Sequence, residues 1–286
     1  MSNLLKSFYI SIYVTLLSIV SIHTLVGLFQ TGFYSVWLGI AIAIWPALLF
    51  FIKLFAAPIA RTSANLNFLI IAAFLGTLLS LLLSQNAQQQ FYAFAYGSGL
   101  GIGGLMLYIF WYSHLGRKAN KALEAGKQLP AFTLKSSDGI PWSSTDLKQH
   151  PALILFFRGN WCPLCMAQIN EIAASYQEME KLGVSVFLVS PQPEPHTKAL
   201  AKKFNVNYHF MIDEQNKAAG LLGIDSKQGT PKGMEILGYD SDTVLPTAIL
   251  TDQKGVILFT DQTDNYRVRP EPDTFLNVFK AHEGSA

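Results

Sequence analysis

The sequence predicts two structurally different parts: an α-helical transmembrane bundle of about four spans, followed by an α/β domain with a central mixed sheet. Two observations predict this division. Residues 1–123 contain no Asp or Glu, and all 19 acidic residues follow from Glu124 onward. Half of the 286 residues are hydrophobic and only 14% are charged, compared with about 25% charged in an ordinary soluble domain. Part of the chain is therefore expected to lie in lipid.

The hydrophobic part contains four apolar stretches, and crossing a bilayer takes about 20 such residues. We predict spans over residues 8–29, 33–57, 68–84 and 91–112, of which the third is the shortest. A cleaved signal peptide would explain only the first stretch, which is too long and lacks a small-residue cleavage site. Buried helices of a soluble protein are a poor alternative because the region has no carboxylate. The expected domains are a transmembrane region at 1–112, a linker helix at 113–128 and an α/β domain at 129–286.

The basic residues near the span ends predict the orientation in the membrane. If four spans alternate, one side holds every basic residue that precedes Glu124: Lys6, Lys53, Arg61, Arg117, Lys118 and Lys121. The loops at 30–32 and 85–90 hold none. Positive residues are retained in the cytoplasm. We therefore expect a multi-pass protein of a bacterial-type inner membrane, with both termini and the α/β domain on the cytoplasmic side.

Two polar or small-residue features lie within the spans. His23 is the only imidazole there, and it either bonds to a neighbouring helix or binds a haem or quinone. We favour the hydrogen bond and expect no cofactor. The pairs Gly97/Gly101 and Gly99/Gly103 have the small-xxx-small spacing that lets helices approach closely.

The remainder of the chain alternates between strand and helix patterns, which predicts parallel βαβ units. The linker at 113–128 is rich in Lys and Ala and is expected to continue the last span as a helix until Pro130. Asp138-Gly139 predicts a hairpin turn. Strands are expected at 131–135, 151–157, 184–190, 208–212, 243–251 and 256–259, and helices from Cys162 to about 182, at 197–204, at 216–222 and from Pro270.

The chain has only two cysteines, Cys162 and Cys165, separated by Pro163 and Leu164. Two cysteines cannot build a structural disulfide framework, and a zinc site would need two further ligands at suitable spacing. The pair follows a predicted strand and opens a predicted helix. Unpaired N–H groups and the helix dipole favour a thiolate at that position, and Arg158 could add positive potential. We therefore expect a redox dithiol and no metal site.

A strand that runs directly into Trp161-Cys162-Pro163-Leu164-Cys165 resembles the thioredoxin superfamily over residues 128–282. The resemblance implies a thioredoxin-like fold in which Cys162 attacks first and Cys165 resolves the intermediate. It also implies that Pro246 is a cis-proline facing the cysteines, with an ordinary trans bond as the alternative. Phe156 replaces the buried Asp of thioredoxin, so Glu171 or a water is left to transfer protons.

The segments RGNWCPLC, VSPQ and DNYRVRPEP are similar to the peroxiredoxin-like branch, grouped with alkyl hydroperoxide reductase C and thiol-specific antioxidant domains. This resemblance implies hydroperoxide reduction by Cys162. The chain departs from the family in having Gly159 where a Thr or Ser orients the peroxide, and Pro246 near the place of an Arg. Arg158, Arg267 or Arg269 could replace that Arg. The expected catalytic residues are Cys162, Cys165, Pro246, Arg158 and Trp161, and the expected substrate-binding residues are Thr247, Gly159 and Arg267.

Three functions remain open. The CxxC pair with an opposing proline favours a membrane-anchored thiol-disulfide oxidoreductase acting on a protein disulfide. A thiol peroxidase acting on hydroperoxides ranks second. A membrane redox sensor or assembly factor, with a cofactor or partner bound by the spans, ranks third. Nucleic acid is not an expected partner because basic residues do not cluster with aromatic ones, and the sequence leaves the oligomeric state open.

Reporter fusions to the C-terminus test the predicted orientation. A cytoplasmic reporter should be active and a periplasm-dependent reporter inactive, because four crossings return the chain to the side that holds the basic residues. Fusions after residue 32 and after residue 88 serve as controls and should show the opposite pattern. Activity of only the periplasm-dependent reporter at the C-terminus would overturn the topology.

Overall fold

The structure is a computed structural model that describes residues 2–147, 150–204 and 206–284. The chain forms two compact units. The helical unit comprises Phe8–Ala57 and Thr62–His114, and the α/β unit comprises Met1–Ser7, Pro58–Arg61 and Leu115–Ala286. Two short segments from the hydrophobic half thus belong to the α/β unit, which the sequence did not indicate.

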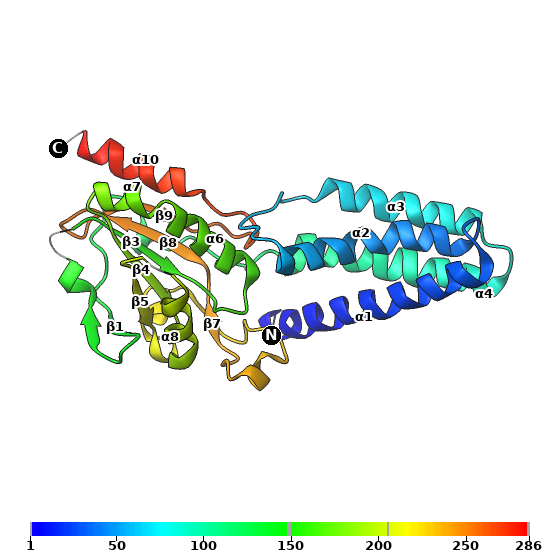
Figure 1. Ribbon diagram of the computed structural model, residues 1–286, viewed down its shortest axis with the longest axis horizontal. Helices are drawn as coiled ribbons and strands as arrows, with labels where there is room; N and C mark the ends of the chain where they lie inside the picture. The colour runs from blue at the N-terminus through cyan, green and yellow to red at the C-terminus, as the bar shows by residue number, and fades with distance from the viewer. Residues whose placement is uncertain (1, 148–149, 205, 285–286) are drawn as a thin grey trace. The chain divides into compact units, whose positions relative to one another are not determined.

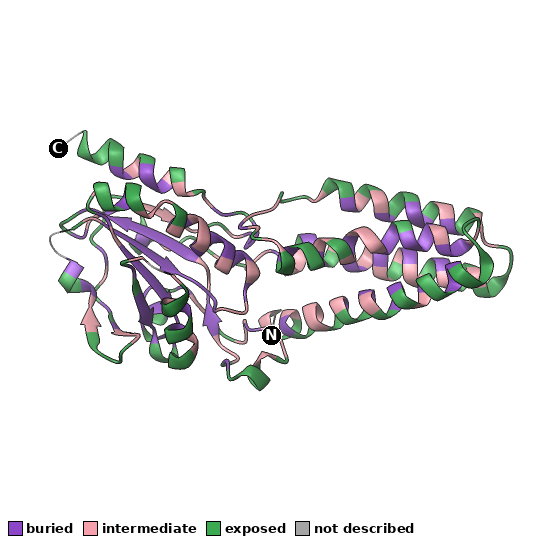
Figure 2. Ribbon diagram, in the orientation of Figure 1, coloured by how far each residue is buried: buried purple, intermediate pink, exposed green. Residues whose placement is uncertain are grey.

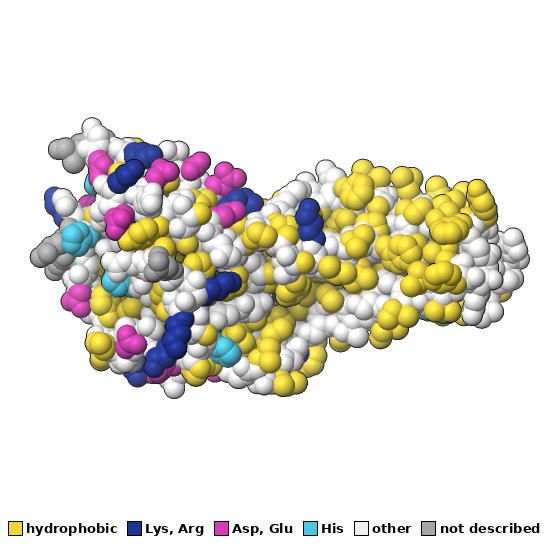
Figure 3. Space-filling model, viewed as in Figure 1, with side chains coloured by type: hydrophobic (Ala, Val, Ile, Leu, Met, Phe, Trp, Pro, Cys, Tyr) yellow, Lys and Arg dark blue, Asp and Glu magenta, His cyan; other side chains and the backbone are white. Residues whose placement is uncertain are grey.

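Helical rods make up the helical unit (Figure 1). They are α1 (Ser2–Thr31), α2 (Val36–Ala56), α3 (Asn67–Leu82) and a last rod made of α4 (Ala87–Tyr92), η1 (Ala93–Gly104), α5 (Leu105–Leu107) and η2 (Tyr108–Tyr112), in which η1 and η2 are π-helical. In the part of the chain that the structure describes, three helices have the length and composition to cross a membrane: Asn3–Thr31, Val36–Ala56 and Ala87–Tyr112. Hydrophobic side chains cover the visible face of this unit in Figure 3.

The third expected span is the exception. Its helix, α3, has 16 residues and rises about 24 Å at 1.5 Å per residue, less than the roughly 30 Å of a hydrocarbon core. The structure therefore supports three helices of full spanning length and a fourth, shorter apolar one.

Glycines allow the helices of this unit to approach closely. Gly97 and Gly101 are buried, and a Cβ on either would meet α3 or α2, as the small-residue pattern predicted. A Cβ on Gly99 or Gly103 would meet only the carbonyls of its own helix. Tighter approaches lie elsewhere. A Cβ on Gly76 of α3 would stand 2.3 Å from a backbone nitrogen of α2, and a Cβ on Gly39 of α2 would stand 2.3 Å from a backbone nitrogen of α3. Backbone contact at these positions leaves no room for any side chain.

His23 has the environment expected of a hydrogen-bonded imidazole between helices. Its Nδ1 lies 3.0 Å from the hydroxyl of Tyr96. The rings of Trp37 and Tyr92 have centroids 4.8 Å and 5.5 Å from the imidazole. These contacts account for a polar ring within an apolar unit.

The α/β unit is built on a mixed seven-stranded sheet of order β2-β1-β5-β4-β3-β8-β9, with a separate β6-β7 pair. Strands β3, β4 and β5 are parallel, and β8, β9, β1 and β2 join antiparallel. The strands are β1 (Thr133–Ser136), β2 (Pro141–Ser143), β3 (Ala152–Phe156), β4 (Ser185–Ser190), β5 (His209–Ile212), β6 (Asp225–Ser226), β7 (Thr243–Val244), β8 (Thr247–Thr251) and β9 (Ile257–Asp261). The predicted central strand, hairpin turn and mixed sheet are confirmed.

Helices cover the sheet on both faces (Figure 1). They are α6 (Pro163–Ala174), α7 (Tyr176–Lys181), α8 (Glu194–Lys203), α9 (Lys217–Leu221) and α10 (Pro272–Glu283), with short 3-10 turns η3 (Lys121–Leu123), η4 (Ser144–Leu147), η5 (Glu214–Asn216) and η6 (Met234–Leu237). α10 packs on β9, where the rings of Phe275 and Phe259 have centroids 6.5 Å apart.

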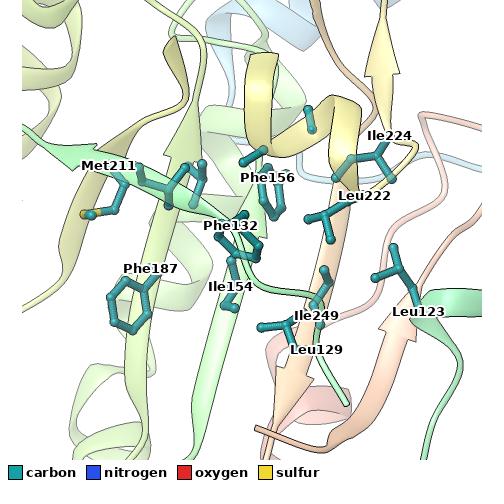
Figure 4. Packing of buried hydrophobic residues seen from close by; sticks show 14 of the residues in the cluster. Leu123, Leu129, Phe132, Ile154, Phe156, Phe187, Met211, Leu222, Ile224 and Ile249 are labelled. Atoms are coloured by element: carbon teal, nitrogen blue, oxygen red, sulfur yellow. The ribbon is translucent and has the colours of Figure 1, made fainter. Parts of the chain in front are cut away.

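The alternation of side chains along the central strand β3 determines which of its residues join the hydrophobic core of this unit. Every residue of β3 is buried, and Figure 2 shows the central strands buried along their length. Ile154 and Phe156 point to the same face because side chains alternate along a strand. There they join a cluster with Phe132, Leu222 and Ile249, and Figure 4 shows Phe132 beside Phe156 and Ile154.

The expected linker helix at 113–128 is wrong. Apart from the three-residue turn η3, this segment is irregular. Besides a few local bonds around η3, its backbone bonds to distant parts of the α/β unit: Leu115 N donates to Asp264 O, and Gly126 N to Ile257 O. Gly116 and Gly126 have φ of 70° and 86°, which suits glycine and breaks helical winding. Tertiary hydrogen bonds thus override the helix propensity of the Lys- and Ala-rich sequence.

Candidate redox-active site

The cysteine pair stands where the central strand β3 passes into α6. Cys162 is the N-cap residue of α6, with φ −90° and ψ 107°, and Pro163 follows at the first helical position. The Cys162 carbonyl accepts the bond from Met166 N at 3.1 Å. Proline suits this position because its missing N–H would have had no intrahelical partner. The predicted strand–CxxC–helix arrangement is therefore present.

The loop before Cys162 is fixed by polar contacts. Gly159 has φ of 142°, and a Cβ there would stand 2.9 Å from the Trp161 ring. Asn160 N donates to Gln192 Oε1 at 2.9 Å. The Arg158 guanidinium lies 4.7 Å from the centroid of the Trp161 ring, a cation–π contact. Glycine at 159 is thus explained by its backbone conformation and close packing.

The two sulfur atoms are buried and close together. Cys162 and Cys165 are 2% and 0% exposed, and their Sγ atoms lie 2.8 Å apart. Arg269 Nη2 lies 3.5 Å from Cys165 Sγ. The same guanidinium donates to Gln168 Oε1 at 2.9 Å from Nη1 and to Tyr266 O at 3.0 Å from Nε. A buried arginine thus faces the second cysteine.

These contacts give the two thiols opposite acidities. Burial, reinforced by the bond to Cys165, raises the pKa of Cys162 well above its usual value. Burial also acts to raise the pKa of Cys165, but the bond from Cys162, the charge of Arg269 and the backbone N–H of Arg158 outweigh it and lower the pKa to about 5. The stabilising groups therefore favour a thiolate on Cys165, whereas the sequence pattern predicted the thiolate on Cys162.

Arg61 forms hydrogen bonds with the backbone at Arg269. It comes from the short segment Pro58–Arg61 of the α/β unit. Its Nε and Nη2 donate to the carbonyls of Arg269 and Pro270 at 3.2 Å and 3.3 Å. It also forms a two-pronged ion pair with Glu171 of α6 and lies 3.6 Å from Glu271. Arg61 thereby ties α6 to the segment that carries Arg269.

Pro246, Thr247 and Arg267 are three further residues that the sequence predicted for the site. The Leu245–Pro246 bond is trans, so the expected cis bond is wrong. The carbonyl of Pro246 and the hydroxyl of Thr247 accept hydrogen bonds from Arg117 at 2.9 Å and 2.7 Å. Arg267 is fully buried.

The guanidinium of Arg158 is only partly hydrogen-bonded. Its Nη2 donates to Gly229 O, while its Nε is buried with no hydrogen-bond partner. Of the three arginines that the sequence nominated, Arg269 contacts a sulfur, with Nη2 3.5 Å from Cys165 Sγ. Glu171, considered for proton transfer, pairs with Arg61 instead.

Sequence reasoning missed Gln168, Arg117 and Arg61. Gln168 lies one turn beyond Cys165 on the same helix, so helical spacing could have nominated it. Arg61 and Arg117 were counted only as basic residues that set orientation, and they precede the cysteines by 101 and 45 positions. Within the described residues, no group of three or more His, Cys, Asp or Glu could hold a metal ion.

Comparisons with known proteins match this part of the chain. The model of the AhpC/TSA family matches residues 125–260. Peroxiredoxin Q of Sedum lineare is 31% identical over 121 residues, covering 42% of this chain and 65% of that protein. The peroxiredoxin bcp of Helicobacter pylori is 30% identical over 123 residues, covering 43% of this chain and 80% of that protein. The chain thus spans slightly less than two thirds of the Sedum protein.

Among solved structures, the peroxidoxin BcpB of Mycobacterium tuberculosis aligns with a TM-score of 0.46 at 16% identity. The alignment covers 56% of this chain and 97% of that one.

Replacing Arg269 tests the electrostatics of the pair. In Arg269→Met, the thiolate absorbance of the reduced protein should titrate at higher pH, because the cation that opposes burial is gone. The midpoint should move up from about 5 by about one unit or more. Lys127→Met, at an exposed residue paired with Glu124, is the control and should titrate as the wild type does. An unchanged midpoint in Arg269→Met would refute the role of this arginine.

Replacing Arg61 tests whether it positions Arg269. Arg61→Ala should move the thiolate midpoint in the same direction by a smaller amount, and Arg61→Lys should restore part of the difference by keeping the pair with Glu171. Lys280→Ala, which removes an exposed partner of Glu178, is the matched control. If Arg61→Ala lowers the melting temperature and leaves the midpoint in place, Arg61 has only a structural role.

Proposed function

Because the chain belongs to the AhpC/TSA family of peroxiredoxins, we propose that it is a membrane-anchored thiol peroxidase that reduces hydroperoxides with Cys162 and Cys165. One observation carries the proposal: the buried Cys165 Sγ lies 3.5 Å from the Arg269 guanidinium. A thiolate is the nucleophile in thiol redox chemistry. A cation beside the sulfur keeps that thiolate charged in a buried site.

The proposed reaction has three steps. The Cys165 thiolate attacks one oxygen of the hydroperoxide, so that an S–O bond forms, the O–O bond breaks and an alkoxide leaves and takes up a proton. The Cys162 thiol then attacks the Cys165 sulfenic acid, which forms the disulfide and releases water. An external dithiol reduces the disulfide and is itself oxidised. The 2.8 Å between the sulfurs supports direct resolution by Cys162.

Burial of both cysteines favours a hydroperoxide over a protein disulfide. A disulfide-exchange partner must bring its own sulfur into line with an attacking sulfur. Cys162 and Cys165 are almost fully enclosed, and a peroxide group is far smaller than a folded partner. This ordering reverses the ranking from the sequence, in which disulfide exchange came first.

The anchoring in a membrane and its orientation are also proposals. Three helices of spanning length and composition support the anchor. Met1–Ser7, Pro58–Arg61 and the chain from Leu115 onward belong to one unit, so they lie on the same side of any bilayer that the helices cross. This supports an even number of crossings. The basic residues near these segments favour the cytoplasmic side.

Single-turnover experiments test both the function and the order of the cysteines. Reduced Cys162→Ser should consume about one hydroperoxide per chain and accumulate a sulfenic acid that dimedone traps, because its attacking thiolate remains. Cys165→Ser should react no faster than a free thiol. The wild type should form the Cys162–Cys165 disulfide without a trappable intermediate.

Two outcomes would contradict the proposal. If Cys165→Ser forms the sulfenic acid and Cys162→Ser does not, the order of attack is the reverse. If the wild type reacts with hydroperoxides at the rate of a free thiol but reduces a protein disulfide rapidly, the enzyme is a disulfide reductase.

A further inference from the structure

The segment 227–239 of the α/β unit exposes large apolar side chains at its tip. Ile236 is 89% exposed and Leu237 is 60% exposed, and both belong to the short turn η6. Glu235, the residue before Ile236, forms an ion pair with Lys232, 2.7 Å apart. Two adjacent side chains this exposed are available for contact with an apolar partner.

Hydrogen bonds hold this segment against the first turn of α1. Asn3 Nδ2 donates to Lys227 O at 3.0 Å. Lys232 N donates to Ser7 O, also at 3.0 Å. Both bonds lie within the α/β unit, to which Met1–Ser7 belongs.

The length of α1 places its first turn at the membrane surface. The apolar helix Asn3–Thr31 has 29 residues and is about 43 Å long at 1.5 Å per residue. The hydrocarbon core of a bilayer is about 30 Å thick, and the headgroup regions extend this to about 40–45 Å. The first turn of such a helix therefore lies among the headgroups, and segment 227–239 is bonded to that turn.

The same segment contacts the loop that precedes the cysteines. Gly229 O accepts a hydrogen bond from Arg158. His196 Nε2 lies 3.0 Å from Leu237 O, and its ring stacks on Tyr239 with centroids 4.4 Å apart. Asn160 Nδ2 donates to His196 O at 2.9 Å. The apolar tip and the loop before Cys162 are therefore joined by short contacts.

We propose that segment 227–239 is a membrane-interface contact, in which Ile236 and Leu237 enter the boundary between headgroups and acyl chains. The partner is the surface of the bilayer that α1 crosses. The inference rests on the proposed membrane anchor. It adds that the α/β unit itself touches lipid, through a segment that contacts the loop before Cys162.

Photocrosslinking in lipid nanodiscs tests the contact. A benzophenone amino acid replaces, in separate full-length proteins, Ile236, Ile140 or Leu49. Ile140 is 64% exposed on the hairpin between the edge strands β1 and β2, and Leu49 is 61% exposed on the apolar helix α2. After irradiation, mass spectrometry counts the chains that carry one phospholipid. The native cysteines stay in place, so hydroperoxide consumption is measured on the same samples.

We expect position 236 to carry about tenfold more lipid adduct than position 140, and position 49 to be labelled strongly, because only side chains within the interface or the core meet lipid. Labelling at 49 with position 236 no higher than 140 would overturn the inference and leave the anchor intact. A protein adduct at 236 in place of lipid would also overturn it. Absence of label at 49 would overturn the anchor, and loss of peroxide consumption alone would count only against the proposed enzyme.

Discussion

The contact between Arg269 and Cys165 is the interaction on which the site depends. A thiolate or a guanidinium buried alone would carry a large desolvation cost, and each is tolerated because the other stands beside it. The pairing is maintained by groups that bind the remaining donors of Arg269, namely Gln168 Oε1 and Tyr266 O. Arg61 then fixes the backbone carbonyl of Arg269 and the helix that carries Cys165. Groups from α6, from the segment Pro58–Arg61 and from Tyr266 thus hold the Arg269 guanidinium beside Cys165.

The sequence predicted well what local patterns determine. The buried strand before the cysteines, the hairpin turn at Asp138-Gly139 and the helix opening at Pro163 all follow from short-range rules of periodicity and turn chemistry. The parallel core followed from the alternation of strands and helices. The position and pairing of Cys162 and Cys165 could therefore be anticipated from a few neighbouring residues.

Features set by long-range contacts could not be anticipated in this way. The thiolate on Cys165 depends on Arg269, 104 positions away, and on the enclosure of both sulfurs. The helix expected at 113–128 does not form, because the backbone of this segment makes hydrogen bonds with residues more than 100 positions further along. Likewise, the spacing of Gly97 and Gly101 was visible within one helix, whereas the backbone contact between Gly39 of α2 and α3 depends on which helix lies opposite.

The short distance between the sulfurs affects how long such an enzyme survives in oxidant. A sulfenic acid on Cys165 can either meet a second peroxide and pass irreversibly to sulfinic acid, or condense with a thiol. With Cys162 Sγ 2.8 Å away on the same turn, condensation needs no unfolding of the helix and no second chain. A resolving thiol this close shortens the time in which a second peroxide can react with the sulfenic acid. The geometry of the pair therefore favours resistance to inactivation by excess oxidant.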